Sequence, residues 1–426
     1  MKSFHEFLSR LDDLVSISSV RTTPSGNAPF GEGIRDCLSY VLEVARLYGF
    51  ETYNYDNYIG EIAWGEGEEI GIIGHVDVVP VSTGWNSHPF TLTEKDEKFY
   101  ARGVVDDKGP VLITLFALKE LKDSGIKFNR RIRFFIGCDE ERDWQDIEYL
   151  KTKTTIPYYG FSPDGDFPLS YAEKGVLQLT FNFPELKNFY RLYGGTVVNA
   201  VCAEACAMPR TAKQIDKKKL KQYKLKTDRI NGIASYGKAA HGSQPKKGRN
   251  AMLNLFRYLR DMGEDVTRIL ECLFFDKYGL DKMHNEQGKV TLSPNILRTE
   301  RDGTFTIICD CRIPAPFTKE DVLAVVDKFG FKYEAVEKHP PFMVDKDGFF
   351  VQTLLSAYKE VTGDENAKPI SMGGSTFARA FSKGCSFGVE FPDEPCNPHQ
   401  ANECISRKSI EKAYDIYKLA IEKLVK

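Results

Sequence analysis

The sequence predicts an α/β protein in which one α/β domain is interrupted by an inserted α+β domain. In the first third of the chain, short apolar runs alternate with helical patterns, as in an open sheet with buried, mostly parallel strands. After about residue 176 alternating strands dominate, and from about residue 338 helices return. We therefore predict a discontinuous domain, residues 1–176 and 338–426, and an inserted domain, residues 177–337.

The elements of the first part follow from the spacing of apolar residues. Amphipathic helices are expected over residues 2–17 and at about 31–48. Buried strands are expected at 69–79 and 131–137, with a helix at 110–125 between them. This order of strand, helix and strand predicts the parallel part of the sheet.

The inserted part is expected to consist mainly of strands. Strand patterns cover residues 176–183, 194–205, 229–242 and 304–314, and helical patterns lie near 248–263 and 319–329. The last part is expected to return to the first domain, with helices at 350–361 and 407–425, a glycine-rich turn at 373–375 and a strand at 385–391.

The composition excludes several classes of function. The 58 basic residues nearly balance the 60 acidic residues, so we expect neither nucleic acid nor an anionic membrane as partner. Charges interrupt the apolar residues of the first twenty positions, which favours a cytoplasmic protein without a secretory signal or membrane span. The ten cysteines are expected as reduced thiols, with Cys309 and Cys311 as small apolar residues on one face of a strand.

The strongest local signal for chemistry is His75, which ends an apolar strand, with Asp77 two residues later. Ligands bind at the carboxyl ends of strands in open α/β sheets, so His75 lies where a metal ligand is expected. Asp77 would accept from the other imidazole nitrogen and select the tautomer of the ring. Taken alone, a surface turn explains this motif equally well.

Acidic clusters follow further along the chain. Asp106 and Asp107 precede a helix, where capping explains one acid better than two. Three adjacent acids follow the strand at 131–137; such acids repel one another unless water or cations separate them, although solvated charge runs are common. Taken alone, Asp164 is better explained as a turn residue, because Gly165 follows it. Of the seven histidines His399 is the second candidate, His88 is undecided, and surface or packing positions are expected for His5, His284 and His339.

Seven motifs occur in order between residues 74 and 403: GHVDVVP, ARGVVDDKGP, GCDEE, SPDGDFP, AAHGSQPKKGRNAM, GGSTFAR and PHQANE. Together they resemble the di-metal aminoacylase and carboxypeptidase superfamily, and the chain is most similar to its peptidase V-like bacterial dipeptidases, of the Xaa-His or carnosinase type. The resemblance implies a di-zinc-peptidase-like catalytic domain, with a mixed, mostly parallel sheet covered by helices on both faces. It also implies that the inserted domain is a lid.

For the metal site, the resemblance implies that His75 and Asp164 bind one ion, that His399 and Glu141 bind the other, and that Asp106 bridges both. Two imidazoles and three carboxylates suit two Zn²⁺ ions, and also Mn²⁺ or Co²⁺.

The same resemblance implies that Glu140 is the general base, that Asp77 orients His75, and that the Asp106–Asp107 peptide bond is cis. Without the resemblance, Arg312 is explained as well by a salt bridge, and His241 by a loop position. The implied substrate-binding residues are Asn199, His241, Arg312, Gly374, Ser375 and Thr376.

The implied activity is that of a metal-dependent dipeptidase, which cleaves dipeptides with a free C-terminal carboxylate by means of a water shared between the two metals. An N-acyl-amino-acid amidohydrolase with the same metal site is the first alternative. A metal-dependent peptide-binding protein without turnover is the second. We expect a small peptide as substrate. The resemblance also implies a monomer rather than an obligate dimer, because the lid at about 177–337 is longer than the one-subdomain lid of dimeric members and could supply its own second half, as in the peptidase V group.

Overall fold

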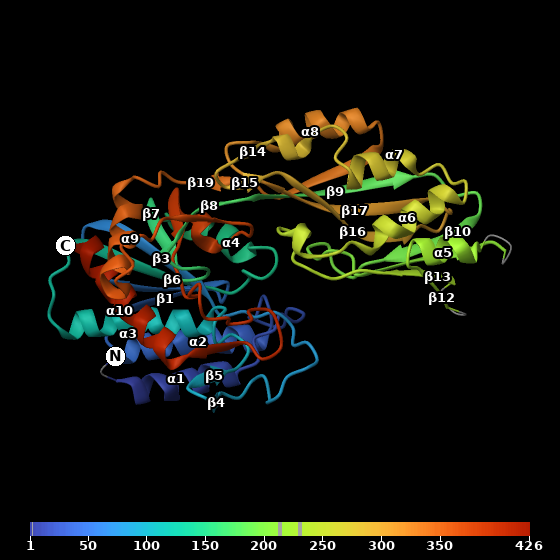
Figure 1. Ribbon diagram of the computed structural model, residues 1–426. Coiled ribbons are helices and arrows are strands. Elements are labelled where there is room, and N and C mark those ends of the chain that lie inside the picture. Colours follow the sequence, from blue (N-terminus) through green and yellow to red (C-terminus); the bar gives the residue numbers. More distant parts are fainter. Residues whose placement is uncertain (2, 212–214, 229–231) are drawn as a thin grey trace. The chain divides into compact units, whose positions relative to one another are not determined.

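The computed structural model describes residues 1, 3–211, 215–228 and 232–426 of the chain (Figure 1). These residues form two compact units. Unit 1 comprises Met1–Tyr171, Val344–Ile370 and Thr376–Lys426, and unit 2 comprises Ala172–Met343 and Ser371–Ser375. Residue 2 and residues 229–231, which begin two of the predicted segments, lie outside the described residues.

Unit 1 is built on a mixed sheet with strand order β1-β2-β6-β3-β7-β21, which continues into β8. Strands β6, β3, β7 and β21 pair in parallel, whereas β1, β2 and β6 pair antiparallel. The elements of unit 1 are α1 (Phe4–Ser16), α2 (Glu32–Leu47), β1 (Glu51–Tyr55), β2 (Ile59–Trp64), β3 (Glu68–His75), β4 (Thr93–Lys95), β5 (Lys98–Tyr100), α3 (Lys108–Asp123), β6 (Arg130–Gly137), α4 (Gln145–Lys153), β7 (Tyr159–Ser162), β8 (Ser170–Glu173, which runs into unit 2), α9 (Phe349–Thr362), β20 (Ile370–Met372, also shared), the 3₁₀ helix η6 (Phe377–Ala380), β21 (Lys383–Ser386), β22 (Cys404–Ser406) and α10 (Arg407–Val425).

Helices cover both faces of this sheet. On one face, Ile73 of β3 and Phe135 of β6 belong to a buried cluster with residues of α4 and η6. On the other face the backbone of the sheet approaches α2 and α3 closely, because a Cβ atom at Gly60 would lie against Leu38 and one at Gly74 against Val111. The central strands are therefore buried on both sides, which explains why they read as continuous apolar runs.

A buried ion pair joins two neighbouring strands of the sheet. The Arg133 guanidinium on β6 donates two hydrogen bonds to the Glu61 carboxylate on β2, over 2.7 and 2.8 Å. Both side chains are almost fully buried. Leaving either charge unpaired there would cost much folding free energy, because water cannot solvate it.

We expect Arg133→Met to lower the free energy of unfolding by about 3–5 kcal/mol, because the buried Glu61 carboxylate loses its counter-charge. Arg131→Met on the same strand is the matched control, since its partner Glu51 is largely exposed and such surface pairs contribute about 0–1 kcal/mol. Urea unfolding measures both variants, and equal losses would contradict the expectation.

Unit 2 contains an antiparallel sheet with strand order β12-β13-β11-β10-β16-β17-β9-β18. Its elements are β9 (Gly175–Phe183), β10 (Phe189–Gly194), β11 (Glu204–Pro209), α5 (Lys217–Gln222), β12 (Lys226–Asp228), β13 (Gly232–Tyr236), η2 (Pro245–Lys247), α6 (Ala251–Asp261), α7 (Thr267–Ile269), the π-helical turn η3 (Leu270–Phe274), η4 (Leu280–Lys282), β14 (His284–Asn285), β15 (Gly288–Lys289), β16 (Thr291–Thr299), β17 (Phe305–Ile313), α8 (Lys319–Val326), η5 (Asp327–Phe329), β18 (Lys332–His339) and β19 (Phe342–Met343).

One face of the unit 2 sheet carries the core, and the other carries polar side chains. In β17, Phe305, Ile307, Cys309 and Cys311 belong to the buried cluster that also contains residues of α6 and α8. Successive side chains of a strand point to opposite faces, so Arg312 lies on the face away from this cluster. All ten cysteines are free and buried.

Three predicted strands are wrong in their extent. Within the described part of the segment 229–242, the strand covers only Gly232–Tyr236. In the segment 194–205 only the ends are strand: the chain between Gly194, the last residue of β10, and Glu204, the first of β11, is a loop, because it turns at Gly195 (φ 70°), whose N–H donates to the Glu204 carbonyl oxygen. The apolar residues of this loop resemble those of a strand in type, but their backbone does not form the hydrogen bonds of a sheet. The strand expected at 385–391 ends at Ser386, before Gly388 turns the backbone to φ 79°.

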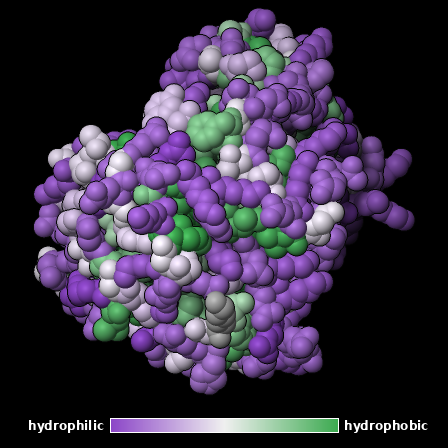
Figure 2. All heavy atoms as spheres, turned by 90° about the vertical axis from the view of Figure 1, so that its left-hand side faces the viewer, coloured by the Kyte–Doolittle hydropathy of each residue, from purple (hydrophilic) through white to green (hydrophobic). Residues whose placement is uncertain are grey.

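Figure 2 shows one face of the molecule, where hydrophilic residues dominate and hydrophobic atoms form separate small patches. Among the helices in the described ranges, none combines the length and the apolar character that crossing a membrane requires.

Candidate metal centre

The centre begins at the end of a central strand of unit 1. His75 is the last residue of β3, and its side chain is almost fully buried. Its Nδ1 atom lies 3.0 Å from the backbone carbonyl oxygen of Asp77 and 3.3 Å from the carboxylate oxygen of the same residue. Both neighbours are acceptors, so they favour a proton on Nδ1 and leave the Nε2 lone pair for another partner.

The carboxylate of Asp77 also holds the turn that follows β6. Its two oxygens accept hydrogen bonds from the backbone N–H groups of Glu140 and Glu141, over 3.2 and 3.1 Å. The buried carboxylate of Asp146 accepts hydrogen bonds from the backbone N–H groups of Cys138 and Asp139, over 2.7 and 3.0 Å. Two carboxylates therefore hold the backbone from which Glu140 and Glu141 project.

Asp106 lies between the two candidate imidazoles. Its Oδ1 atom is 3.0 Å from His75 Nε2, and its Oδ2 atom is 2.8 Å from His399 Nε2. The Asp106–Asp107 peptide bond is cis, as the resemblance implies. A single carboxylate thus faces two imidazoles that are far apart in the sequence.

The remaining predicted ligands complete two groups of side chains. Glu141 Oε1 lies 3.0 Å from His399 Nε2, and Asp164, which follows β7, has Oδ2 3.9 Å from His75 Nε2. Within each group, ligand atoms lie within 4.8 Å of one another; the groups are His75, Glu140 and Asp164, and Asp106, Glu141 and His399. The structure therefore brings all five predicted ligands and the predicted base together, while His5, His88 and His284 are exposed and belong to neither group.

Burial and repulsion raise the pKa of most of these carboxyls. Burial, followed by the charge of Asp106, raises the pKa of Asp164 to about 7. Burial is also the main cause that raises the pKa of Glu140 and of Glu141 above the ordinary glutamate value. For Asp106 burial acts in the same direction, but the two adjacent imidazoles outweigh it and lower its pKa below the usual range. A crowded set of acids of this kind favours bound cations.

Two buried atoms of the centre, His75 Nε2 and Glu141 Oε1, make no hydrogen bond among the described residues, although each lies 3.0 Å from an atom of another candidate ligand. Each belongs to a different one of the two groups. Imidazole nitrogens and carboxylate oxygens are the ligands that zinc takes in catalytic sites, and manganese and cobalt accept the same mixture. The residues present therefore fit a pair of divalent metal ions.

In unit 2 two of the predicted substrate-binding residues lie on adjacent segments. The N–H of Gly242, next to His241, donates to the Asn199 carbonyl oxygen over 2.6 Å. The side chains of Asn199 and His241 are both exposed. His241 Nδ1 lies 2.7 Å from the Ser243 hydroxyl, so the orientation of the ring is linked to that hydroxyl.

The guanidinium of Arg312 is already engaged within unit 2. Its Nε and Nη2 atoms donate to the carboxylate of Asp310 over 2.8 and 3.0 Å, and Nη1 donates to the Gly373 carbonyl oxygen over 2.8 Å. The salt bridge is therefore present, but a guanidinium has five N–H donors, so two remain for a ligand. Arg312 also holds the segment that leads to Gly374.

The hydroxyls after Gly374 have different surroundings. The Oγ atom of Ser375 is buried and has no hydrogen-bond partner. Thr376 caps η6, because its Oγ1 accepts from the N–H of Ala378 over 3.3 Å. Ser375 is thus the hydroxyl with unused hydrogen-bonding capacity.

Sequence reasoning missed Arg102 and Glu403, which form a fully buried ion pair with Nη1 and Oε2 2.6 Å apart. Glu403 also accepts the backbone N–H of Asp106 over 3.3 Å. Both residues stand inside motifs already noted, ARGVVDDKGP and PHQANE. The signal that the sequence offered was an arginine shortly before Asp106 and a glutamate shortly after His399, two opposite charges that could pair beside the candidate ligands.

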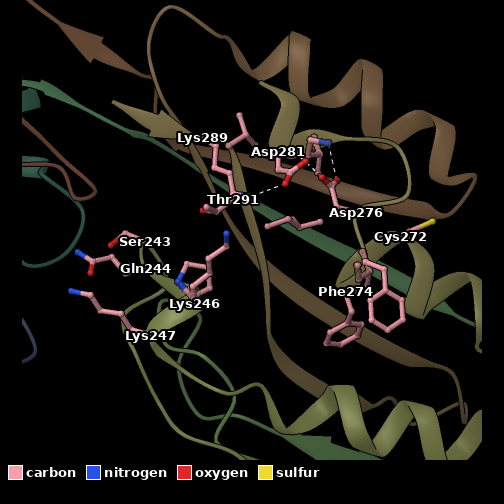
Figure 3. Close-up of a pocket in the computed structure, with 16 residues that line it drawn as sticks. Ser243, Gln244, Lys246, Lys247, Cys272, Phe274, Asp276, Asp281, Lys289 and Thr291 are labelled. Carbon is pink, nitrogen blue, oxygen red and sulfur yellow. Dashed lines mark hydrogen bonds and ion pairs between the residues drawn. The ribbon is translucent and has the colours of Figure 1, made fainter. Parts of the chain in front are cut away.

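A cavity of about 660 Å³ lies within unit 2 (Figure 3). Ser243 and Lys246 line it on one side, and Phe274 and Thr291 belong to the facing segments. None of its lining residues is a predicted metal ligand. Three of its lining residues contact predicted substrate-binding residues: Ser243 and Gln244 hydrogen-bond to His241, and Thr291 on β16 pairs with Arg312 on β17.

The sequence matches a model of peptidase family M20/M25/M40 over residues 71–423. A protein of Staphylococcus saprophyticus named "putative dipeptidase" is 33% identical, with coverage of 100% of this chain and 98% of the relative. One of Staphylococcus haemolyticus with the same description is 34% identical, with coverage of 98% and 97%.

Solved structures with the same fold include human carnosine dipeptidase 1, with a TM-score of 0.60 and 14% identity over 99% of this chain and 97% of that one. The di-peptidase Dug1p of Saccharomyces cerevisiae has a TM-score of 0.61 and 14% identity, over 99% and 96%. These likenesses confirm the predicted α/β fold class.

Proposed function

Because the chain belongs to peptidase family M20/M25/M40, we propose that it is a metal-dependent dipeptidase that cleaves dipeptides with a free C-terminal carboxylate. One observation carries the proposal. His75 and His399, from the first and last parts of the chain, face the two oxygens of the same carboxylate, Asp106. The names of the staphylococcal relatives support a dipeptide as substrate.

In this proposal His75 and Asp164 hold one metal ion, His399 and Glu141 hold the other, and Asp106 contacts both. Two bound divalent ions would supply Lewis acidity, which polarises the peptide carbonyl and lowers the pKa of a water molecule. Zinc is the first candidate, and manganese or cobalt also suits the ligand set.

Glu140 is the general base of the proposal. Its carboxylate takes a proton from the attacking water and returns it to the nitrogen of the leaving amine. Asp77 holds the N–H of Glu140 and also faces His75 Nδ1. A single buried carboxylate therefore positions both the base and a metal ligand.

The substrate-binding roles rest on donor chemistry and on the resemblance. Asn199 and His241 would donate to the oxygen that becomes negative during attack. Arg312 and the donors of Gly374, Ser375 and Thr376 would bind the substrate carboxylate. In the same proposal unit 2 acts as a lid, and the enzyme works as a cytoplasmic monomer on small peptides.

Comparing free dipeptides with their N-acetylated counterparts tests the proposal. The protein is stripped of metal, refilled with Zn²⁺, Mn²⁺ or Co²⁺, and assayed for kcat/KM on both series. We expect the free dipeptides to be cleaved faster. Faster cleavage of the acetylated series would favour an N-acyl-amino-acid amidohydrolase, and metal binding without turnover of either series would favour a peptide-binding protein.

A further inference from the structure

Glu403 is a buried carboxylate that binds the backbone of the segment carrying Asp106. Its Oε1 atom accepts hydrogen bonds from the N–H groups of Val105 and Asp106, over 2.9 and 3.3 Å. The residue has no exposed surface. Hydrogen bonds to a charged acceptor are stronger than those between neutral groups, and more so where water is excluded.

The charge of Glu403 is balanced from the same segment. Arg102 Nη1 donates to Glu403 Oε2 over 2.6 Å, and the guanidinium lies 5.5 Å from the centre of the Trp85 ring. Arg102 is also almost fully buried. Glu403 therefore contacts residues on both sides of the turn that ends in Asp106.

Glu403 itself belongs to the loop that carries His399. The side chain of His399 is 53% exposed, so packing alone does not hold the imidazole in place. The loop is anchored by its far end instead: Asn402 accepts from the Asn86 N–H over 2.9 Å and donates to the Gly84 carbonyl oxygen over 3.1 Å. Glu403, the next residue, connects the loop directly to the Asp106 backbone by accepting its N–H.

We propose that Glu403 is a positioning residue that sets Asp106 and His399 at the separation which a metal ion requires. Without this link the two segments could each fold, but metal binding would have to order them relative to each other. The inference rests on the ligands of the proposed function. It differs from that function because it concerns metal affinity and not hydrolysis.

The test is the affinity of the metal-free, full-length protein for Zn²⁺, measured by competition with a chromophoric chelator. We expect Glu403→Gln to weaken the binding of at least one of the two ions by about 10–100-fold, the usual effect of losing a group that supports a ligand. Glu394→Gln is the matched control. Its carboxylate accepts hydrogen bonds from Ser406 and Ser409 in the same part of the chain, whereas no hydrogen bond among the described residues joins it to Asp106 or His399.

A second measurement separates positioning from general stability. Thermal unfolding is recorded with and without Zn²⁺, and we expect the rise in Tm on adding zinc to shrink in Glu403→Gln. A purely structural role would lower both melting temperatures equally. That result, or unchanged zinc affinity in the folded variant, would overturn the proposal.

Because Glu403→Gln leaves Arg102 with a buried charge, it could unfold the protein. The double variant Arg102→Met/Glu403→Met removes both charges and keeps similar volume, a replacement that is often tolerated. It still lacks the acceptor for the Val105 and Asp106 N–H groups. We expect weakened zinc binding in this folded double variant, and wild-type zinc affinity there would contradict the proposal, whatever the enzyme does with peptides.

Discussion

Replacing Glu140 by Gln is expected to lower kcat for dipeptides by about 10²–10⁴-fold, the usual contribution of a general base. The amide has the shape of the carboxylate but cannot accept a proton at neutral pH. Because the five proposed ligands remain, we expect the variant to bind zinc as the wild type does. The measurements are kcat on a free dipeptide and the zinc content of the purified protein.

Glu148→Gln is the matched control for this variant. Glu148 lies on α4, a few residues further along, and its side chain is 71% exposed in a pair with Lys151. We expect it to leave kcat unchanged. Wild-type activity in Glu140→Gln would refute the assignment of the base, and loss of a zinc ion would reassign Glu140 as a ligand beside His75 and Asp164.

Asp106→Asn is expected to abolish the binding of at least one zinc ion, and dipeptide hydrolysis with it. An amide retains one oxygen but no charge, so it cannot serve two cations as a carboxylate does. The loss of zinc affinity should exceed the roughly 10–100-fold effect of changing a residue that only supports a ligand. Isothermal titration of the metal-free protein with Zn²⁺ measures both the number of ions and their affinity.

Asp123→Asn serves as the control, because Asp123 ends α3 and its exposed carboxylate pairs with Lys119. Its zinc stoichiometry should equal that of the wild type. If Asp106→Asn still bound two ions with unchanged affinity, Asp106 could not be the shared ligand, and the arrangement of the proposed metal pair would have to be revised.

Strongly periodic segments could be predicted closely. The last helix was expected at 407–425 and is Arg407–Val425, and the helix expected at 350–361 is Phe349–Thr362. The segment 194–205 could not be predicted in this way. An apolar, β-branched run looks the same in a strand and in a loop, and only the pairing of the backbone distinguishes them.

The predicted enzyme class, a peptidase of this superfamily, is confirmed by the family match. The proposed ligands could be named from sequence because each stands at the end of an apolar run or in a short loop within a recognisable motif. That His75, Asp106 and His399 meet is a property of the fold, which the structure supplies.

By itself, the sequence determined the family, the α/β class and the residues capable of binding metal, because motifs and periodicity are local properties of the chain. Only the tertiary structure decided that Asp77 also holds the turn of Glu140, that Arg312 is paired with Asp310, and that Glu403 binds the Asp106 segment. Hydrogen-bond partners are selected by which groups are buried together when the chain folds. For a carboxylate such as Glu403, the partners lie about three hundred positions away in the sequence, beyond the reach of any local pattern.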